Sequence, residues 1–388
     1  MCVKKWQKVL LFTGTHILVA ALAAVLAYGL FLRQTDGMSK LQQLYRLIDD
    51  RYVGQYDDQS LFDYAAAGMV AGTGDRWSYY VSAKDMASFN AEKDNAYVGV
   101  GITISAREDG LGADILRVEP GGSAQEAGIQ GGDILYKVEG QLLGEIGVDG
   151  ASALIAGEAG TQVKITVLRG EQELEFTLTR KHIQRAVAQG NMLENHIGYI
   201  RIENFNANCA KHTIEQIKTL VEQGAEGLVF DVRYNGGGYV SEMVKILDYL
   251  LPEGELFVSQ YYDGEKYVET SDQNCLEMPM MVLVNQDSYS AAEFFAATLR
   301  EYEWAQVVGL PTVGKSYFQE TYEFADGSAV SLSVGKYFTP KGVCLQDQGG
   351  LVPDVVVEVD DTTAAAIYAQ TIDPKDDPQL QKALELLQ

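Results

Sequence analysis

The chain has 388 residues, which is enough for two or three domains with a sizeable core. Hydrophobic residues make up 47% and charged residues 22%, a composition typical of folded globular protein rather than of disorder. The formal net charge is −24, from 54 acidic and 30 basic side chains. A field of that sign repels phosphate backbones and therefore argues against nucleic acid as a partner.

Cysteine and histidine are few and scattered. The four cysteines are Cys2, Cys209, Cys275 and Cys344, and no two of them have the C-x-x-C spacing of a thiolate zinc site. None of the four histidines falls in an H-E-x-x-H arrangement. The sequence therefore predicts no metal site and no cofactor, while one disulfide among the last three cysteines stays open if the chain is exported.

Residues 9–32 form an apolar stretch without a single charge. Such a stretch is long enough to cross about 30 Å of hydrocarbon as a transmembrane helix. Lys4, Lys5 and Lys8 precede it, and this excess of positive charge favours a cytoplasmic N-terminus. We expect an uncleaved membrane anchor, with a cleaved signal peptide as the alternative. In both cases the body of the chain lies outside the cytoplasm.

Residues 38–95 are expected to be helical. Apolar residues recur at intervals of three and four, as in Leu41, Leu44, Tyr45, Leu47 and Ile48. The segment contains no motif that carries chemistry. We therefore interpret it as an amphipathic arm for packing or dimerisation and expect no catalytic contribution from it.

From Tyr97 to Arg180 the pattern changes to short strands separated by glycine-rich turns. The expected strands are VGVGITI, ADILRV, DILYKVEG, KITVL and LEFTLTR, and the expected helices are SAQEAG and GASALIAG. The stretch PGGSAQEAGIQGGDILYKVEG and the loop YVGVGI resemble a PDZ domain. The resemblance implies that a peptide's C-terminal carboxylate binds the amides of this loop, which consists of Tyr97, Val98, Gly99, Val100, Gly101 and Ile102. On the glycines alone, a tight turn that binds nothing is the alternative.

From Asn195 onward apolar strands alternate with helices. The expected strands are IGYIRI, GLVFDVR, PMMVLVN and AQVVGL, separated by the helices CAKHTIEQIKTLVEQG, YVSEMVKILDYLL and AAEFFAATLREYE. This alternation predicts crossover connections and a largely parallel sheet covered by helices. The segment YEFADGSAVSLSVGKYF predicts an antiparallel hairpin that turns at Asp326-Gly327, and the tail beyond it is expected to be helical.

Two features of this α/β part can carry chemistry. The first is VFDVRYNGGGYV, which leads from a strand through three glycines into a helix. Glycines at that point allow backbone amides to face an anion or an oxyanion, although the spacing is not that of a phosphate loop. A tight strand-to-helix turn is the structural alternative for the same residues.

The second feature is Ser290, at the entrance of a helix in VLVNQDSYSAAEFFA. As a structural residue, Ser290 or Ser288 would be a helix N-cap with Glu293 as its capping-box partner. The G-x-S-x-G elbow of the α/β-hydrolases is absent. Ser290 on its own therefore does not identify a nucleophile.

Lys315 follows an apolar strand in VVGLPTVGKSYFQE and, taken alone, is a solvated loop lysine. Burial would have to lower its pKa from about 10.4 to about 7–8, a change of about 4 kcal/mol that is within the range burial supplies. A neutral lysine can accept the proton of a serine hydroxyl, so that no histidine is needed. Lys315 is therefore a candidate base for Ser290.

These segments together resemble the C-terminal processing peptidases, also called tail-specific proteases. The resemblance rests on SYSAAEFFAA, VGLPTVGKSYFQE and DGSAVSLSVGKYFTPKGVCLQDQGGLVPDVVV, and it extends from about Leu41 to Leu387. It implies that Ser290 is the nucleophile and that Lys315 is the general base. It also implies that Gln319 orients the lysine. Because side chains at i and i+4 on a strand lie ~13 Å apart, we expect a tightly turned backbone over residues 315–319.

The same resemblance implies an oxyanion hole made of backbone amides. One amide belongs to Ala291, and the other belongs to Gly238, with Gly237 as the near alternative. The turn departs from the pattern of the family, because Gly236 stands where the family often has a proline. That change loosens the turn but leaves the amide donors in place.

The pattern and the resemblance predict an α+β multidomain protein with four parts. Residues 1–35 would be a cytoplasmic tip and transmembrane anchor, 36–95 a helical arm, 96–182 a PDZ-like β domain, and 183–388 a protease core with a helical tail. The core would have an α/β fold of the crotonase/ClpP-like type.

The function implied is that of a single-pass membrane-anchored serine endopeptidase whose catalytic part is extracytoplasmic. It would cut exported or membrane proteins near their C-terminal tails, with access gated by the PDZ domain, and the resemblance suggests a homodimer formed through the helical arm. The alternative is a catalytically inactive PDZ scaffold that binds C-terminal tails. The presence of Ser290, Lys315 and Gln319 together argues against that alternative.

Overall fold

The computed structural model describes residues 16, 19, 22, 35–107 and 109–387. The chain divides into two units, one that ends at Ala65 and one that begins at Ala66. The expected membrane anchor at residues 9–32 lies almost wholly outside the described residues. Among the residues that are described, no helix is both long enough and apolar enough to cross a membrane.

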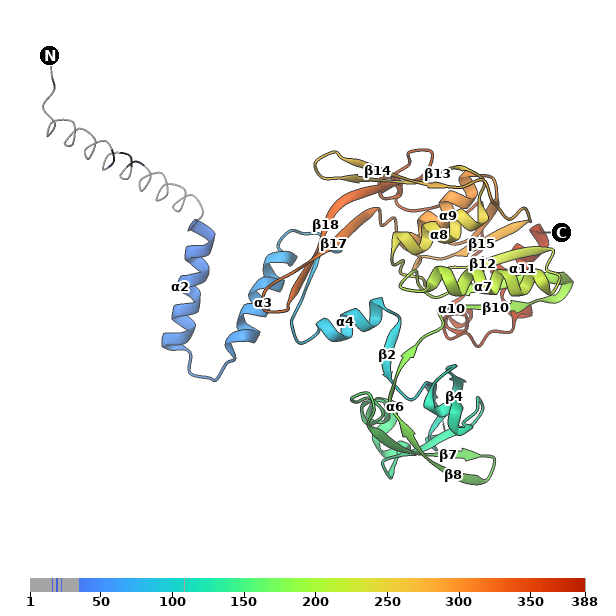
Figure 1. Ribbon diagram of the computed structural model, residues 1–388, viewed down its shortest axis with the longest axis horizontal. Coiled ribbons are helices and arrows are strands. Elements are labelled where there is room, and N and C mark those ends of the chain that lie inside the picture. Colours follow the sequence, from blue (N-terminus) through green and yellow to red (C-terminus); the bar gives the residue numbers. More distant parts are fainter. Residues whose placement is uncertain (1–15, 17–18, 20–21, 23–34, 108, 388) are drawn as a thin grey trace, which may run out of the picture. The chain divides into compact units, whose positions relative to one another are not determined.

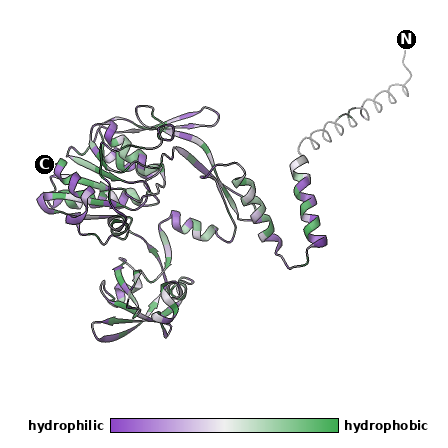
Figure 2. Ribbon diagram, turned by 180° about the vertical axis from the view of Figure 1, so that it is seen from behind, coloured by the Kyte–Doolittle hydropathy of each residue, from purple (hydrophilic) through white to green (hydrophobic). Residues whose placement is uncertain are grey.

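The first unit contains helix α2 (Thr35–Arg51) and the start of helix α3 (Asp58–Ala71). The ring of Tyr45 stacks on that of Phe62 with 5.3 Å between the ring centroids, and its hydroxyl donates to Asp58 at 3.1 Å. Hydrophobic residues nevertheless alternate with hydrophilic ones along the surface of both helices (Figure 2), and Leu44 and Leu47 are more than half exposed. The prediction of helix is confirmed for both segments, while the amphipathic pattern is clear only in α2, because α3 ends in the apolar run AAAGMVA.

The rest of the arm contains a strand as well as a helix. Strand β1 (Tyr79–Val81) pairs antiparallel with β18 (Ala329–Phe338), with Tyr79 opposite Ser331, and helix α4 (Met86–Lys93) follows. The prediction of helix throughout 38–95 is therefore wrong at β1. The reason is tertiary, because the pairing joins residues 331 − 79 = 252 positions apart.

The PDZ-like part is an antiparallel sheet with the strand order β3-β4-β5-β7-β8 and a short β6 on β5. Its strands and helices are β3 (Ile102–Ala106), β4 (Ala113–Val118), α5 (Ser123–Ala127), β5 (Ile134–Val138), β6 (Gln141–Leu142), α6 (Leu143–Ile155), β7 (Gln162–Arg169) and β8 (Gln172–Thr179). Inward-facing residues such as Ile115, Leu135 and Ile165 are fully buried in its core. The strands expected at ADILRV, DILYKVEG, KITVL and LEFTLTR are confirmed.

The strand expected at VGVGITI is in fact two strands. Gly101 has a φ of +86° and breaks the run, so that β2 (Ala96–Gly99) and β3 belong to different sheets. β2 pairs antiparallel with β9 (Lys181–Gln184), which leaves the PDZ-like part at its other end. The PDZ-like part is therefore inserted into the rest of the second unit through a two-stranded ribbon.

The core of the second unit is a six-stranded sheet with the order β10-β11-β12-β15-β16-β19. Its strands are β10 (Ala188–Met192), β11 (Ile197–Ile202), β12 (Gly227–Asp231), β15 (Met280–Val284), β16 (Ala305–Gly309) and β19 (Val355–Val356). All neighbours from β11 to β19 are parallel, and β10 is antiparallel. The prediction of a largely parallel sheet is confirmed.

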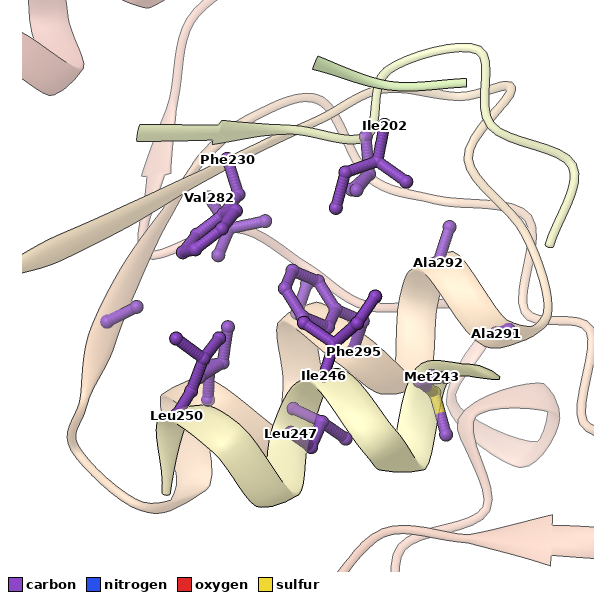
Figure 3. Close-up of a cluster of buried hydrophobic side chains, with 14 of the residues drawn as sticks. Ile202, Phe230, Met243, Ile246, Leu247, Leu250, Val282, Ala291, Ala292 and Phe295 are labelled. Atoms are coloured by element: carbon purple, nitrogen blue, oxygen red, sulfur yellow. The ribbon is translucent and has the colours of Figure 1, made fainter. Parts of the chain in front are cut away.

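Helices cover both faces of this sheet. Helices α7 (Cys209–Glu222), α8 (Val240–Leu250) and α9 (Ala291–Glu301) lie beside its strands in Figure 1 and bury one face. Figure 3 shows Phe230 and Val282 of the strands pointing toward Ile246 of α8 and Phe295 of α9. Helix α11 (Pro378–Leu386) covers the other face. Because Ala291 and Ala292 are buried in the first cluster, the start of α9 has a fixed position.

A second sheet contains the predicted hairpin. β17 (Tyr317–Glu323) and β18 pair around a turn in which Gly327 has a φ of +86°, which confirms the turn at Asp326-Gly327. β13 (Gly254–Tyr261) and β14 (Lys266–Ser271) form a hairpin in the same sheet that the sequence pattern did not reveal. The predicted helical tail is confirmed as α10 (Asp361–Tyr368) and α11. Short 3-10 turns lie at Glu194–His196, Leu345–Gln348 and Pro374–Asp376.

A buried ionic cluster fixes the loop that follows β12. Arg233 contacts Asp231 at 2.6 Å and Asp377 at 2.8 Å, and all three side chains are almost wholly buried. Burial alone would raise the pKa of Asp231, but the charge and hydrogen bonds of Arg233 hold that pKa below its usual range. Removing one partner of such a group would leave an uncompensated buried charge, at about 3–5 kcal/mol. These contacts attach the chain just before the glycine turn (residues 235–238) to the C-terminal tail.

Candidate active site

Ser290 lies at the N-terminus of α9 in a conformation that serine rarely adopts. Its φ is 59° and its ψ is −126°, and the residue is 8% exposed. A non-glycine residue with positive φ stores about 1–3 kcal/mol of backbone strain, and such residues cluster at functional sites. Ser288 is different, because it is fully buried and its hydroxyl donates to the carbonyl of Val232 at 2.7 Å. Ser288 is thus a structural residue, whereas Ser290 is the serine that packs against Gly237 of the glycine turn.

The glycine turn lies directly against Ser290. A Cβ on Gly237 would come within 2.8 Å of the Cβ of Ser290 and within 3.0 Å of the amide nitrogen of Ala291. The Gly237 amide donates to the side-chain oxygen of Asn235 at 2.8 Å. Within the described part of the chain, the amides of Gly238 and Ala291 have no acceptor. Of the three expected oxyanion donors, Gly237 is therefore already engaged, while Gly238 and Ala291 remain available.

The structure explains why glycine suits position 236, where a proline is expected to be frequent in the family. A Cβ on Gly236 would lie 2.5 Å from the hydroxyl oxygen of Tyr289. A proline at this position would therefore displace the tyrosine that precedes Ser290.

Glu293 connects the serine segment to the lysine segment. One carboxylate oxygen accepts the Ser290 amide at 2.9 Å and the Lys315 amide at 2.8 Å. The other accepts the Gly314 amide at 2.6 Å and the hydroxyl of Thr312. Burial raises the pKa of Glu293, while these hydrogen bonds act in the opposite direction. The capping-box interpretation of Glu293 is correct but incomplete, since the carboxylate also fixes the backbone at Lys315.

The Lys315 side chain lies over two aromatic rings. Its Nζ is 4.7 Å from the ring centroid of Trp77 and 5.8 Å from that of Tyr289. Among the described residues, no hydrogen bond joins this ammonium group to the hydroxyl of Ser290. Burial, together with the positive charge of Lys93, lowers the pKa of Lys315 to about 8. The arm therefore does contribute to this site, contrary to the sequence-based expectation, through Trp77 and Lys93.

Gln319 lies on β17 and bonds away from Lys315. Its side-chain amide donates to the hydroxyl of Ser333 at 3.0 Å and to the carbonyl of Tyr317 at 3.1 Å. The Ser333 amide in turn donates to the hydroxyl of Ser78 at 2.9 Å, and that hydroxyl donates to Asp75 at 2.6 Å. A chain of hydrogen bonds thus joins Gln319 to the arm.

The backbone after Lys315 is not tightly turned, so that prediction is wrong. β17 begins at Tyr317, and a β-bulge lies between Phe318 and Gln319 where the register against β18 shifts. Pairing with β18 across the hairpin keeps the segment extended. The bulge redirects the side chains that follow it without forming a turn.

The six residues of the expected peptide-binding loop do not act as one loop. Tyr97 and Val98 lie in the β2–β9 ribbon and line a cavity of about 650 Å³ that Gly237 and Gly238 also line. Val100 is buried in the core of the PDZ-like part. Ile102 begins β3, which is an edge strand of its sheet, next to α6. Only the end of the predicted loop is thus placed beside a strand edge that a peptide could extend.

The fold and this site together define a serine-type peptidase with a PDZ domain, and comparison with known proteins gives the family. Residues 196–357 match the profile of peptidase family S41, residues 115–169 match a PDZ domain, and residues 29–85 match the N-terminal domain of the activating protease CtpB. The carboxy-terminal processing protease CtpA of Bacillus subtilis (strain 168) is 32% identical over 327 residues, which is 83% of this chain and 69% of the relative. The chain belongs to peptidase family S41, the C-terminal processing proteases, and is a serine-type endopeptidase.

Two further comparisons agree with this assignment. A probable CtpA-like serine protease of Staphylococcus aureus (strain COL) is 28% identical over 369 residues, covering 92% of this chain and 73% of the relative. The crystal structure of a putative S41 protease from Bacteroides fragilis NCTC 9343 superposes with a TM-score of 0.55 at 16% identity. That superposition covers 86% of this chain and 90% of the other and supports the fold alone.

Proposed function

We propose that the chain cuts exported or membrane proteins near their C-terminal tails, with Ser290 as the nucleophile and Lys315 as the general base. The observation that carries this proposal is the position of Glu293. Its single buried carboxylate binds the backbone of both residues, and Ser290 stands at the N-terminus of a helix. A lysine whose pKa is lowered to about 8 supplies a usable fraction of neutral amine near neutral pH.

In the proposed reaction the Ser290 hydroxyl oxygen attacks the scissile carbonyl carbon, and its proton passes to the neutral amine of Lys315. The amides of Gly238 and Ala291 donate to the oxyanion that forms. Lys315 then gives the proton to the leaving amine, and the peptide C–N bond breaks. Lys315 then takes a proton from water, whose oxygen attacks the acyl carbon. The ester C–O bond breaks, Lys315 returns the proton to the Ser290 oxygen, and the acid product leaves, which restores both residues.

This chemistry requires a rearrangement of the lysine. The ammonium must leave the rings of Trp77 and Tyr289 and reach the hydroxyl of Ser290. Gln319 must correspondingly exchange its bond to Ser333 for one that orients Lys315. The positions of Lys315 and Gln319 in this structure would thus belong to a resting state of the enzyme. Substrate binding would select the active conformation.

The PDZ domain would hold the tail of the substrate and gate this change. β3 is an edge strand, so one side of its backbone pairs with no other strand of the sheet, and α6 lies beside it. An extended peptide could therefore add as a further strand. In this proposal the amides around Gly101, before Ile102, would receive the terminal carboxylate.

Anchoring and assembly are part of the same proposal. The apolar residues 9–32, preceded by three lysines, would hold the protein in the cell membrane with the catalytic part outside the cytoplasm. The half-exposed apolar side chains of α2, such as Leu44 and Leu47, would pack against a second copy in a homodimer.

The experiment is digestion of unfolded casein by the purified protein, with and without a hydrophobic tail peptide. Ser290→Ala and Lys315→Ala should each abolish cleavage to a similar degree, because the two residues act as one unit. Lys341→Ala, a change of an exposed loop lysine, is the matched control and should retain the rate. Cleavage by Ser290→Ala at the wild-type rate would refute the nucleophile, and a near-normal Lys315→Ala rate would refute the base.

A further inference from the structure

A cavity of about 650 Å³ opens beside the proposed nucleophile. Gly236, Gly237, Gly238 and Tyr289 form part of its wall, and Gly237 is the residue that packs directly against Ser290. A peptide whose carbonyl reaches Ser290 therefore comes next to Gly237, a residue of the cavity wall. A side chain or chain end next to the scissile bond can enter it.

The cavity contains more positive charge than the rest of this acidic protein would suggest. Lys93 at the end of α4 and Arg185 just after β9 both line it, and Glu92 is the one carboxylate that does so. Within the described part of the chain, neither Lys93 nor Arg185 forms an ion pair with a carboxylate. Arg185 instead lies 5.7 Å from the ring centroid of Tyr97, and Lys93 lies 5.7 Å from that of Phe89.

Burial makes the unpaired charge of Lys93 unfavourable. Its pKa is lowered because burial disfavours the ammonium form, although Glu92 acts in the opposite direction. A partly buried ammonium group such as that of Lys93 gains from a nearby opposite charge. Lys93 is half-buried and Arg185 is exposed to solvent on the same cavity, and neither has an ion-pair partner among the described residues, so both cations can meet a negative group of a ligand that enters the cavity.

The polar side of the cavity is rigid. Asn95 and Asn204 exchange side-chain hydrogen bonds of 3.1 and 3.0 Å, and Asn206 donates to the carbonyl of Glu92 at 3.2 Å. The backbone is also fixed, because the Lys93 carbonyl accepts the Ala207 amide at 3.0 Å. The Arg185 amide likewise donates to the Asn95 carbonyl at 2.8 Å. Both cations therefore start from ordered backbone, which reduces the entropy lost on binding.

Building on the proposed peptidase function, we propose that this cavity is a subsite that binds a carboxylate of the substrate through Lys93 and Arg185. The carboxylate belongs either to an acidic side chain near the cut or to the chain end of the segment being removed. Both sources present the same planar group, which suits the fork of a guanidinium and the point charge of an ammonium. The subsite would select where the enzyme cuts, separately from any tail held by the PDZ domain.

The test uses a casein-derived peptide that the wild-type protein cleaves, in matched acid and neutral forms. One pair differs in a C-terminal carboxylate or carboxamide, and further pairs carry Glu or Gln at each position beside the cut. At one position the acid form should be preferred in kcat/KM by about 10- to 100-fold, the effect of one hydrogen bond to a charged group. The pair that shows the preference identifies the source of the carboxylate.

Variants then assign the preference to the two cations. The double change Lys93→Gln and Arg185→Gln should bring the ratio of acid to neutral rates close to one. Arg185→Lys keeps the charge and should keep part of the ratio, whereas Lys84→Gln, the same charge change at an exposed lysine outside the cavity, should leave the ratio intact. Circular dichroism checks that each variant is folded.

Direct binding separates this proposal from the one on which it rests. Fluorescence anisotropy of the labelled peptides on the Ser290→Ala protein reports the acid preference without any cleavage. Equal affinity for acid and neutral forms, or a preference that survives in the double variant, overturns the subsite even if wild-type protein cleaves normally. Cleavage by Ser290→Ala at the wild-type rate overturns the proposed catalytic role while the binding preference can still be measured.

Discussion

Raising the pH from 6 to 9 should increase kcat/KM along a single acid limb that reports the deprotonation of Lys315. The active form of a general base is the neutral amine, so activity must rise as the pH passes through its pKa. Burial and the charge of Lys93 lower that pKa to about 8, while Asp75 and Glu293 act to raise it. Activity should therefore increase about tenfold per pH unit below pH 7 and level off above about pH 9.

The magnitude of the benefit follows from the size of the shift. Lowering the pKa from its ordinary 10.5 to about 8 corresponds to about 3 kcal/mol. At pH 7 about one lysine in ten is then neutral, compared with about one in 3,000 without the shift. The environment of Lys315 thus supplies about 300-fold more active base at that pH.

The assay is hydrolysis of an internally quenched peptide without acidic residues, measured from pH 6 to 10 with the Ser290→Ala rate subtracted. Lys93→Gln should move the acid limb to higher pH, because one positive charge that disfavours protonation of Lys315 is lost. Lys84→Gln should leave the limb where it is. A flat profile, or a limb near pH 10 in the wild-type protein, would refute the assignment of Lys315 as a desolvated base.

Three substitutions test the framework of the site. Glu293→Gln should lower the free energy of unfolding, measured in urea, by at least about 2 kcal/mol and should abolish cleavage. The reason is that a neutral amide cannot accept the four hydrogen bonds that the carboxylate accepts. Wild-type stability of this variant would contradict the role of Glu293. Gly238→Ala should prevent folding or activity, since a Cβ would lie 2.4 Å from the backbone of Phe205. Gly264→Ala, at a φ of +92° with open space around it, should cost only about 1–2 kcal/mol and serves as its control. Phe295→Ala should destabilise the core by about 3–5 kcal/mol in the same urea measurement, and a loss below 1 kcal/mol would refute its role as a core anchor.

Local patterns in the sequence were sufficient for most of the fold. The alternation of apolar strands and helices after Asn195 predicted the parallel sheet, and Gly327 predicted the hairpin turn, because both signals lie in adjacent residues. The split of VGVGITI into two strands was missed because the deciding property is the positive φ of Gly101. A glycine permits that conformation but does not require it.

The site was predicted less completely than the fold. The sequence located the segments of Ser290 and Lys315. It did not predict that both bind one buried carboxylate, because helix capping alone accounted for a glutamate at position 293. Trp77 was missed for a different reason. Its contact with Lys315 depends on the pairing of β1 with β18, and no pattern within the arm encodes a partner so distant in the chain.

The pairing of β1 with β18 determines when, during synthesis, the active site can be completed. Residues 79–81 emerge early during synthesis, but their partner strand is made 252 residues later, which takes roughly 13–50 s at about 5–20 residues per second. During that interval the segment that carries Trp77 has no strand to pair with. A nascent or truncated chain therefore lacks a finished site, and proteolytic competence is delayed until almost the whole polypeptide is present.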